Sequence, residues 1–237
     1  MKSNSQFDTS KAAYQQTRIT HWDAIAEKRD HWRGAGGWYH RRLNQLYLFL
    51  IPPGQHILEI GCSTGDLLAE LRPARGVGVD FSPGMIARAR AKHPTLEFIE
   101  ADAHNLAGVK GPFDVIIFSD AVNDLWDVQT AFEQARQLCA PSTRLIANFY
   151  SHLWQLPLGL VQRFGLANPL LDQNWLTRED ITGMLNLAGF EVIRATQEIL
   201  WPLPLGGFFN HFLVRFWPFT GLALSNIVIA RPSPERV

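Results

Sequence analysis

Strand-like and helix-like segments alternate along the middle of the chain, and this alternation limits the folds that the chain can adopt. Short apolar runs, each expected to form a strand, occur at residues 55–61, 76–80, 96–101, 113–119 and 143–149. Helical patterns separate them at residues 66–71, 83–92 and about 128–138. Repetition of this kind predicts a parallel sheet with helices on both faces. Residues 115–118 are apolar without alternation, as expected for a central strand that is covered on both sides.

Two further strands are expected near the C-terminus, at Phe190–Ile199 and Ala223–Ala230, which brings the sheet to seven strands. A helix is expected before them. Thr177 is placed to cap its N-terminus, with Asp180 three residues later as a shorter substitute for the usual Glu of a capping box. Gly189 is expected to end this helix.

The organisation of the chain suggests a helical N-terminal segment, residues 1–51, followed by a single α/β domain, residues 52–237. Between about His21 and Leu50, apolar residues recur at helical spacing on either side of the glycine-rich residues 33–37. This pattern predicts two helices joined by a flexible hinge. Two prolines directly after Ile51 are expected to stop the second helix, because proline lacks an amide donor.

Regularity weakens in two later segments, at about 151–176 and 201–222, which are rich in Leu, Trp and Phe. Insertions of this length in a compact domain are usually functional. We therefore expect both segments to form caps over a site.

Composition excludes several classes of protein. Lys and Arg balance Asp and Glu at 22 each, so no basic field favours nucleic acid as a partner. The N-terminus lacks the apolar stretch of a secretory signal. Prolines and polar residues interrupt the segment 201–230, so no transmembrane helix is expected, while peripheral contact with a membrane stays open. Cys62 and Cys139 lack metal-site spacing and are interpreted as free thiols in a reducing cytosol, which predicts a cytoplasmic protein.

A glycine-containing turn links the first strand of the domain to its first helix. The turn reads Gly61-Cys62-Ser63-Thr64-Gly65 and leads into a helix that starts at Asp66. Glycines let the backbone approach a ligand, and the helix N-terminus presents free amide donors. A plain β-to-α turn would also favour glycine, so the turn alone is weak evidence.

Acidic residues end the first three strands and strengthen the case for a ligand. Asp80 ends the second strand about 20 residues beyond Glu59, the spacing at which a carboxylate accepts hydrogen bonds from ribose hydroxyls in doubly wound folds. Asp102 follows the third strand, where it could accept a bond from the amine of adenine. These strand ends should meet at one crevice and bind an adenosine-type cofactor there.

From about Ile51 to Arg231 the chain resembles the class I S-adenosylmethionine-dependent methyltransferases. The matching motifs are Glu59–Gly65 with Ser63 in place of the middle glycine, Val79–Met85, Asp102-Ala103 and Phe113–Asp120. The resemblance implies a Rossmann-like, mostly parallel sheet with an antiparallel last strand, under an N-terminal helical lid. A nicotinamide-dependent oxidoreductase is the main rival, but it should show a GxGxxG turn, and here only two glycines are present.

The resemblance also implies S-adenosyl-L-methionine as the cofactor, with S-adenosyl-L-homocysteine as the product. Gly61 and Gly65 would lie near its methionine part, Asp80 on the ribose and Asp102 at the adenine amine. Phe81 and Met85 would pack against the adenine, with a role as ordinary core residues as the alternative. The full set of expected cofactor-binding residues is Glu59, Gly61, Cys62, Ser63, Gly65, Asp80, Phe81, Met85, Asp102, Ala103 and Ser119.

Few obligatory catalytic residues are expected, because a methyl transfer of this kind needs mainly proximity and orientation. The candidates, all near the ends of the fourth and fifth strands, are Asp120, Asn123, Tyr150 and His152. Asp120 or Asp124 could take a proton and Asn123 could orient a hydroxyl, while Asp124 could instead cap the next segment. A packing role stays more common than catalysis for any single histidine, and the histidines lack the spacing of a metal site.

The acceptor is expected to be a small molecule that is apolar, aromatic or glycosylated and is methylated on oxygen, nitrogen or carbon. Its presumed pocket is surrounded by aromatic and leucine residues, namely Trp154, Leu156, Phe164, Trp175, Trp201, Phe208, Phe209, Phe212, Phe216 and Trp217. Packing of these residues on the sheet is an equal alternative. A protein that binds S-adenosylmethionine or S-adenosylhomocysteine without transferring a methyl group is the second functional hypothesis, and either a monomer or a homodimer fits.

Overall fold

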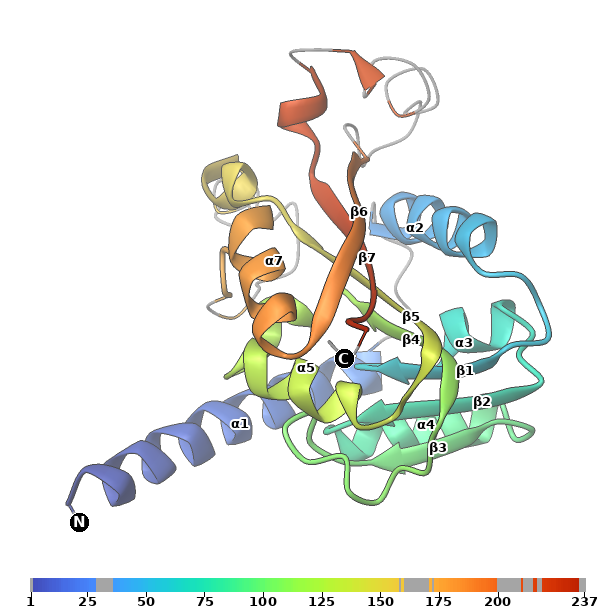
Figure 1. The fold of residues 1–237 in the computed structure, drawn as a ribbon. Helices are drawn as coiled ribbons and strands as arrows, with labels where there is room; N and C mark the ends of the chain where they lie inside the picture. The colour runs from blue at the N-terminus through green and yellow to red at the C-terminus, as the bar shows by residue number, and fades with distance from the viewer. Residues whose placement is uncertain are drawn as a thin grey trace.

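The structure is a computed structural model of the 237-residue chain. It describes residues 2–28, 36–157, 159, 171, 173–199, 210, 215–216 and 219–234. Within these residues one seven-stranded sheet forms the centre of the fold, in the order β3-β2-β1-β4-β5-β7-β6 (Figure 1). The strands are β1 (His56–Ile60), β2 (Arg75–Asp80), β3 (Glu97–Glu100), β4 (Phe113–Ser119), β5 (Cys139–Tyr150), β6 (Phe190–Glu198) and β7 (Ser225–Pro232).

The direction of the strands confirms the predicted sheet. β1 pairs in parallel with β2 and β4, β2 with β3, and β4 with β5. β7 is antiparallel to both β5 and β6, as expected for the last strand. The chain builds outward from β1 to β3 and then returns to β4 on the other side of β1. In open α/β sheets, ligands bind at such a reversal, beyond the carboxyl ends of the strands.

Helices cover both faces of the sheet, as predicted. On one face, α2 (Gly36–Leu50), α3 (Asp66–Glu70) and α4 (Pro83–Lys92) bury apolar residues against Ile57, Val115 and Ile117. On the other, α5 (Val128–Arg136) and α7 (Arg178–Leu187) bury theirs against Leu58 and Ile116. Neighbouring residues of β1 and β4 therefore serve opposite faces, as the period of a strand requires.

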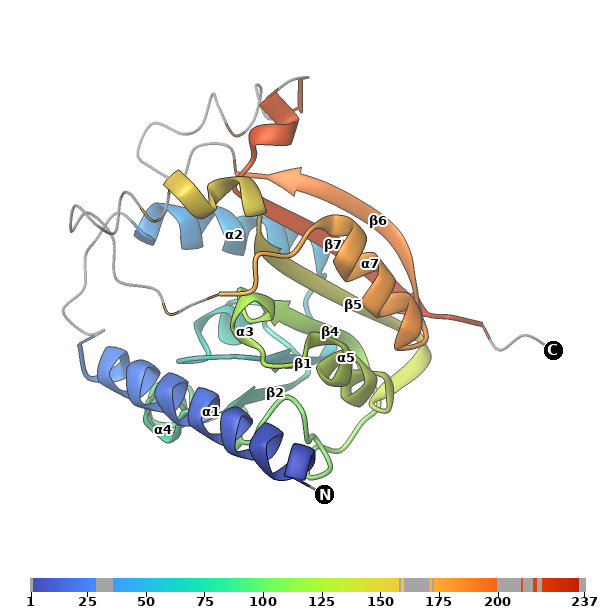
Figure 2. The same cartoon turned by 90° about the vertical axis from the view of Figure 1, so that its left-hand side faces the viewer.

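The first helix, α1, is longer than expected. It spans Lys2–Lys28, whereas the apolar spacing predicted a helix only from about His21. Figure 2 shows α1 alongside α4, at the edge of the sheet that holds β2 and β3. The predicted hinge at residues 33–37 lies mostly outside the described part of the chain, and α2 begins at Gly36.

Element boundaries differ from the sequence prediction at β5. This strand begins at Cys139, four residues before the expected Thr143, and α5 ends at Arg136 rather than near Leu138. Cys139 is paired with Phe113 across an irregularity in the register, which local sequence does not reveal. Both cysteines are free, as expected.

The two predicted caps are described only in part. Of the aromatic residues assigned to the acceptor pocket, Phe164, Trp201, Phe208, Phe209, Phe212 and Trp217 lie outside the described residues. The described pieces include η3 (His152–Trp154) and η5 (Phe219–Leu222), two short 3-10 helices. None of the helices in the described ranges combines the length and apolar character needed to cross a membrane.

Candidate active site

The turn after β1 is held in a left-handed backbone conformation at three positions. Gly61, Ser63 and Gly65 have φ angles of 78°, 50° and 74°. A Cβ on Gly61 would lie 2.7 Å from the Cβ of Ala121, and one on Gly65 would collide with the ring of Phe98. Both glycines are therefore required by conformation and by space, whereas Ser63 tolerates an angle that glycine would adopt more easily.

Asp80, at the end of β2, fixes this turn. Its Oδ2 accepts a hydrogen bond from the backbone N–H of Ser63 and its Oδ1 accepts one from that of Ser82, both at 2.9 Å. Burial raises the pKa of Asp80, while these backbone donors act in the opposite direction. A carboxylate has about four lone-pair sites. Asp80 therefore keeps the capacity to accept further hydrogen bonds from a ligand at the turn.

Glu59 precedes the turn in β1 and is buried, with 3% of its surface exposed. Its Oε2 has no hydrogen-bond partner among the described residues. Burial raises the pKa of Glu59 to about 8, and the nearby carboxylates Asp80 and Asp66 add to the effect. The neighbouring thiol of Cys62 is likewise buried, which raises its pKa well above the usual value. A buried, unsatisfied carboxyl oxygen beside the turn suits a cationic or hydrogen-bond-donating group.

Asp102 follows β3 and is contacted from two sides. Its Oδ1 accepts from the backbone N–H of His104 at 3.0 Å and contacts Nδ1 of the same residue, and its Oδ2 accepts from the side-chain amide of Gln15 on α1. Burial acts to raise the pKa of Asp102, but the bonds from His104 and Gln15 outweigh it and the pKa is lowered. Ala103 is buried beside it.

The predicted adenine contacts differ in exposure. Met85 is buried in α4, and its sulfur accepts a hydrogen bond from Oγ of Ser63 at 3.4 Å. Phe81 is half-buried after β2. Met85 thus contacts the turn through Ser63, in addition to any contact with a ligand.

Helix α1 is attached to the same edge of the sheet by polar contacts. Asp23 accepts hydrogen bonds from Oγ of Ser82 and, at 3.0 Å, from the backbone N–H of Gly84 at the start of α4. Tyr14 donates to the carbonyl oxygens of Asp124 and Leu125, at 3.3 and 3.4 Å. With Gln15 on Asp102, α1 reaches residues that follow β2, β3 and β4.

Beyond β4, Asp120 lies at the centre of a buried hydrogen-bond network. Its φ angle is 53°, a left-handed conformation that is uncommon outside glycine. Oδ1 accepts hydrogen bonds from the hydroxyl of Tyr39 at 2.7 Å and from Nδ2 of Asn148 at 2.5 Å. Ser119, half-buried at the end of β4, pairs with Asn148 of β5. Burial raises the pKa of Asp120, and His40 and Tyr39 oppose the rise.

Two tyrosines border this network. The hydroxyl of Tyr39 also contacts Oγ of Ser225 at 3.1 Å, and its ring centroid lies 5.8 Å from that of Tyr150. Burial, reinforced by the charge of Asp120, raises the pKa of both phenols well above their ordinary value. Both hydroxyls therefore stay protonated at neutral pH, and that of Tyr39 donates to Asp120.

The other two catalytic candidates occupy different environments. Asn123 is fully buried in η2 (Val122–Asp124), where its Oδ1 accepts from the N–H of Tyr150 at 3.0 Å and its Nδ2 donates to the carbonyl of Asn174 at 2.7 Å. His152 begins η3 and is exposed. The structure thus brings Asp120, Asn123 and Tyr150 together, with His152 two residues beyond Tyr150 at the surface.

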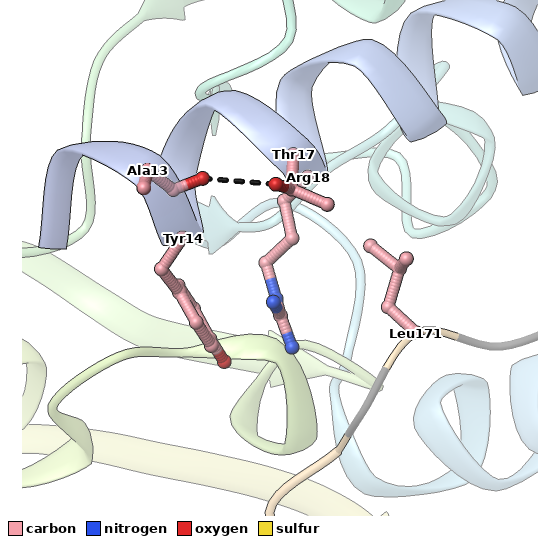
Figure 3. A pocket seen from close by; sticks show the side chains of 5 residues that line it. All are labelled: Ala13, Tyr14, Thr17, Arg18 and Leu171. Carbon is pink, nitrogen blue, oxygen red and sulfur yellow. Dashed lines mark hydrogen bonds between the residues drawn. The ribbon is translucent and has the colours of Figure 1, made fainter. Parts of the chain in front are cut away.

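A pocket of about 330 Å³ opens beside α1 (Figure 3). Ala13, Tyr14, Thr17 and Arg18 line it from the helix and Leu171 from the opposite side. The guanidinium of Arg18 stacks on the ring of Tyr14 at 3.5 Å, and its Nε lies 3.8 Å from Oδ1 of Asp124. Burial raises the pKa of Asp124 to about 6, against the influence of Arg18.

The sequence prediction missed Gln15, Arg18, Asp23, Tyr39 and Asn148. Asp23 contacts Ser82 and Gly84, which lie between the predicted residues Phe81 and Met85. The others contact a candidate site residue that is far away along the chain: Tyr39 lies 81 positions from Asp120, and Gln15 lies 87 positions from Asp102. No spacing rule connects residues so distant. The one available signal was an unexplained polar residue in an apolar strand, Asn148.

Residues 57–142 match the family model described as a methyltransferase domain. That segment contains the glycine turn and the strand-end residues Asp80, Asp102 and Asp120. Over these residues the chain is similar to methyltransferase domains, in agreement with its resemblance to the class I S-adenosylmethionine-dependent methyltransferases. The match to a methyltransferase domain agrees with S-adenosylmethionine as the cofactor predicted from the sequence.

Individual relatives agree with this family. A demethylmenaquinone methyltransferase of Thermus thermophilus is 33% identical over 138 residues, which cover 55% of this chain and 62% of the relative. The chain spans about half the length of the curated relatives it matches first. Activity and substrate therefore do not follow from these matches.

Solved structures share the methyltransferase fold. A methyltransferase of Thermotoga maritima superposes with a TM-score of 0.69 at 16% identity, and the match covers 90% of this chain and 99% of that one. The magnesium protoporphyrin IX methyltransferase of Synechocystis, solved with S-adenosylhomocysteine bound, gives a TM-score of 0.63 at 18% identity, with 93% and 100% covered. Their agreement concerns the fold alone.

Proposed function

We propose that this protein transfers a methyl group from S-adenosyl-L-methionine to a small-molecule acceptor. The observation that carries the proposal is the position of Asp80. Its carboxylate holds the turn at Ser63 by one oxygen and the start of α4 by the other, and it still has lone pairs for the two hydroxyls of a ribose.

The residues beside Asp80 fit the rest of the cofactor. Gly61 and Gly65 leave backbone space that a side chain would fill, next to Cys62 and Ser63. The unsatisfied Oε2 of Glu59 suits the amino group of the methionine part. The remaining members of the proposed site are Phe81, Met85, Asp102 and Ala103 around the adenine and Ser119 near the methyl group.

Asp102 would receive the adenine amine on an oxygen that Gln15 now contacts. A protein carboxylate oxygen can accept two hydrogen bonds, so the amine can join Gln15 rather than replace it. Residues 1–51 would then form a lid that shields the adenine, since α1 reaches Asp102 directly. The α/β domain proper would comprise residues 52–237.

When bound, the cofactor supplies an electrophilic methyl group, and the protein supplies orientation and exclusion of water. Among the catalytic candidates, we assign Asn123 a positioning role, because both ends of its side-chain amide are bonded to the backbone. Asp120 and the protonated Tyr150 lie nearer the acceptor. His152 would contact only an acceptor that extends toward the surface.

The acceptor side is proposed to include the pocket between α1 and Leu171. Tyr14 and the guanidinium of Arg18 stacked on its ring line this pocket together, and such a lining suits an aromatic ring with an electron-rich or anionic oxygen. Curated relatives that methylate demethylmenaquinone, a quinone-type ring, support this class of acceptor. A phenol, a quinol or a related aromatic compound is the proposed substrate.

Two measurements test the function in sequence. Titration calorimetry should show that the protein binds both S-adenosylmethionine and S-adenosylhomocysteine, and failure to bind either contradicts the proposal. A screen with tritium-labelled methyl donor over phenols, naphthoquinols, sugars and lipid extracts should then find label in an aromatic product. Binding without any transfer would favour the alternative, a cofactor-binding module without methyltransferase activity.

A further inference from the structure

Resting on the proposed methyl transfer, we propose that His40 is the general base that removes the proton of an acceptor hydroxyl, with Asp120 as the residue that positions it. The side chains of His40 and Asp120 link α2 to the end of β4. Nδ1 of His40 lies 3.9 Å from Oδ2 of Asp120. This is an ion-pair distance, and such contacts often tighten to a hydrogen bond only when a substrate is bound.

The other hydrogen bonds of the Asp120 side chain involve one carboxylate oxygen and leave the second facing His40. Tyr39 and Asn148 both donate to Oδ1, so that oxygen is occupied and Oδ2 faces the imidazole. The backbone N–H of Asp120 is bonded to Asn148 at 3.2 Å, which anchors the residue to β5 in its left-handed conformation. Strained backbone that its surroundings over-determine is a feature of functional sites.

The orientation of His40 is set by the residue next to it. Tyr39 precedes it in α2, and the two rings meet edge to face with centroids 5.2 Å apart. Tyr39 is buried, whereas half of the His40 side chain is exposed. The same turn of α2 therefore holds Tyr39 in the core and leaves the side chain of His40 half exposed, where a small molecule can reach it.

The pair lies beside the proposed cofactor site. Ala121 directly follows Asp120, and its Cβ lies so close to Gly61 that a side chain there would not fit. β1 and β4 are neighbours, with Ile60 paired to Phe118 two residues before Asp120. The His40–Asp120 pair is thus placed at the methyl end of the cofactor, where the acceptor must approach.

The proposed step balances in atoms and charge. Nε2 of His40 takes the proton of the acceptor hydroxyl, and an electron pair of the oxygen forms the new bond to the methyl carbon. The bond between carbon and sulfonium sulfur breaks, and its electron pair stays on sulfur, which becomes a neutral thioether. Asp120 stabilises the imidazolium that results, as a carboxylate does for histidine in catalytic triads.

Other titratable groups around the pair do not replace it. Tyr39, Tyr47 and Tyr150 are protonated, because burial and the charge of Asp120 both raise the pKa of their phenols. Asp124 is the remaining charged neighbour, and its partner is Arg18. Of the titratable groups in this described network, His40 has the most exposed side chain, at 50% against 19% for Asp120 and 12% for Asp124.

The first experiment does not depend on any acceptor. ¹⁵N NMR of the full-length protein labelled at histidine should show neutral His40 with its proton on Nδ1, because Asp120 faces that nitrogen. Asp120→Asn should abolish this preference. A proton on Nε2 in the wild-type protein would overturn the inference, since that nitrogen could then not accept one.

The second experiment compares acceptors of different acidity. His40→Gln should reduce methylation of catechol or 1-naphthol by about 100- to 10,000-fold, the usual contribution of a general base. Nitro-substituted analogues, which are already ionised at the assay pH, should lose less than about tenfold, because they need no base. An equal loss on both kinds of acceptor would assign His40 a structural role and overturn the proposal.

A control variant and a binding measurement separate the role of His40 from the proposed methyl transfer. His56→Gln, exposed at the amino end of β1, should leave both rates unchanged. His40→Gln should bind S-adenosylhomocysteine as the wild type does. If the wild-type protein does not bind the cofactor, the proposed function is contradicted. If the wild type and His40→Gln transfer methyl groups at the same rate, only the role of His40 is contradicted.

Discussion

The backbone N–H of Ser63 donates a hydrogen bond of 2.9 Å to Oδ2 of Asp80. One carboxylate thus connects the left-handed turn after β1 with the end of β2. Asp80→Ala should weaken binding of S-adenosylhomocysteine at least about 10- to 100-fold, because a hydrogen bond to a charged group contributes about 1.5–3 kcal/mol. Titration calorimetry measures the effect.

Asp114 provides a matched control for Asp80. It also accepts a hydrogen bond from the backbone, that of His56 at 2.8 Å, but it lies at the opposite end of the sheet. Asp114→Ala should leave the affinity unchanged. Equal affinity in the wild type and in Asp80→Ala would refute the assignment of Asp80 to the ribose.

Gly65→Ala should destabilise the fold. The left-handed backbone costs about 1–2 kcal/mol once a Cβ is present, and the collision with Phe98 adds about 1–3 kcal/mol of overpacking. Urea denaturation should therefore show a loss of about 2–5 kcal/mol. Gly108→Ala, where a Cβ would meet no atom within 4 Å, should change stability by less than about 1 kcal/mol. Similar losses in the two variants would contradict the packing of the turn.

Glu59 should make stability depend on pH. Burial raises its pKa in the folded protein to about 8, from an ordinary value of 4.5. The folded state then binds a proton more tightly than the unfolded state does. The stabilisation of the fold by the proton on Glu59 is fully present below about pH 4.5. It falls as pH rises toward 8, by at most about 1.4 kcal/mol per pH unit.

Comparison with Glu59→Gln isolates this effect, because all other titrating groups stay the same. The free energy of unfolding of the wild type should fall relative to that of the variant between pH 5 and pH 8, measured by urea denaturation at each pH. A constant difference over that range would show that the folded-state pKa of Glu59 is not raised.

Asp23→Ala should release α1 from the start of α4. The change removes the acceptor for Oγ of Ser82 and for the N–H of Gly84, which costs about 1 kcal/mol as for other capping contacts. Hydrogen exchange of residues 10–25 should become severalfold faster, while that of β1 and β4 stays the same. Thr20→Ala is the control, since its hydroxyl donates within α1, to the carbonyl oxygen of Gln16. Unchanged exchange in Asp23→Ala would mean that other contacts hold the helix.

Several local features could be predicted from neighbouring residues alone. Thr177 and Asp180 form the expected capping box, with both of its hydrogen bonds present, and Gly189 ends α7 in a left-handed conformation. The same is true of the glycine turn and of the acid that ends β2. Each depends on backbone geometry within a few residues, for which spacing rules exist.

The extent of α1 could not be predicted in this way. Most of the helix lacks an apolar stripe. Polar contacts place it, from Tyr14, Gln15, Arg18 and Asp23 to residues that follow β2, β3 and β4. A helix without such a stripe gives no periodic signal. Its position is a property of the surface on which it docks.

The amino-acid sequence by itself determined the αβ alternation, the glycine turn and the acids at the strand ends, and these were enough to predict the family and its cofactor. Only the tertiary structure decided which groups surround Asp120. Tyr39, Asn148 and Ser225 come from α2, β5 and β7, up to 186 residues apart. Hydrogen bonds between such distant residues depend on how elements pack around the sheet, and no local propensity specifies that packing.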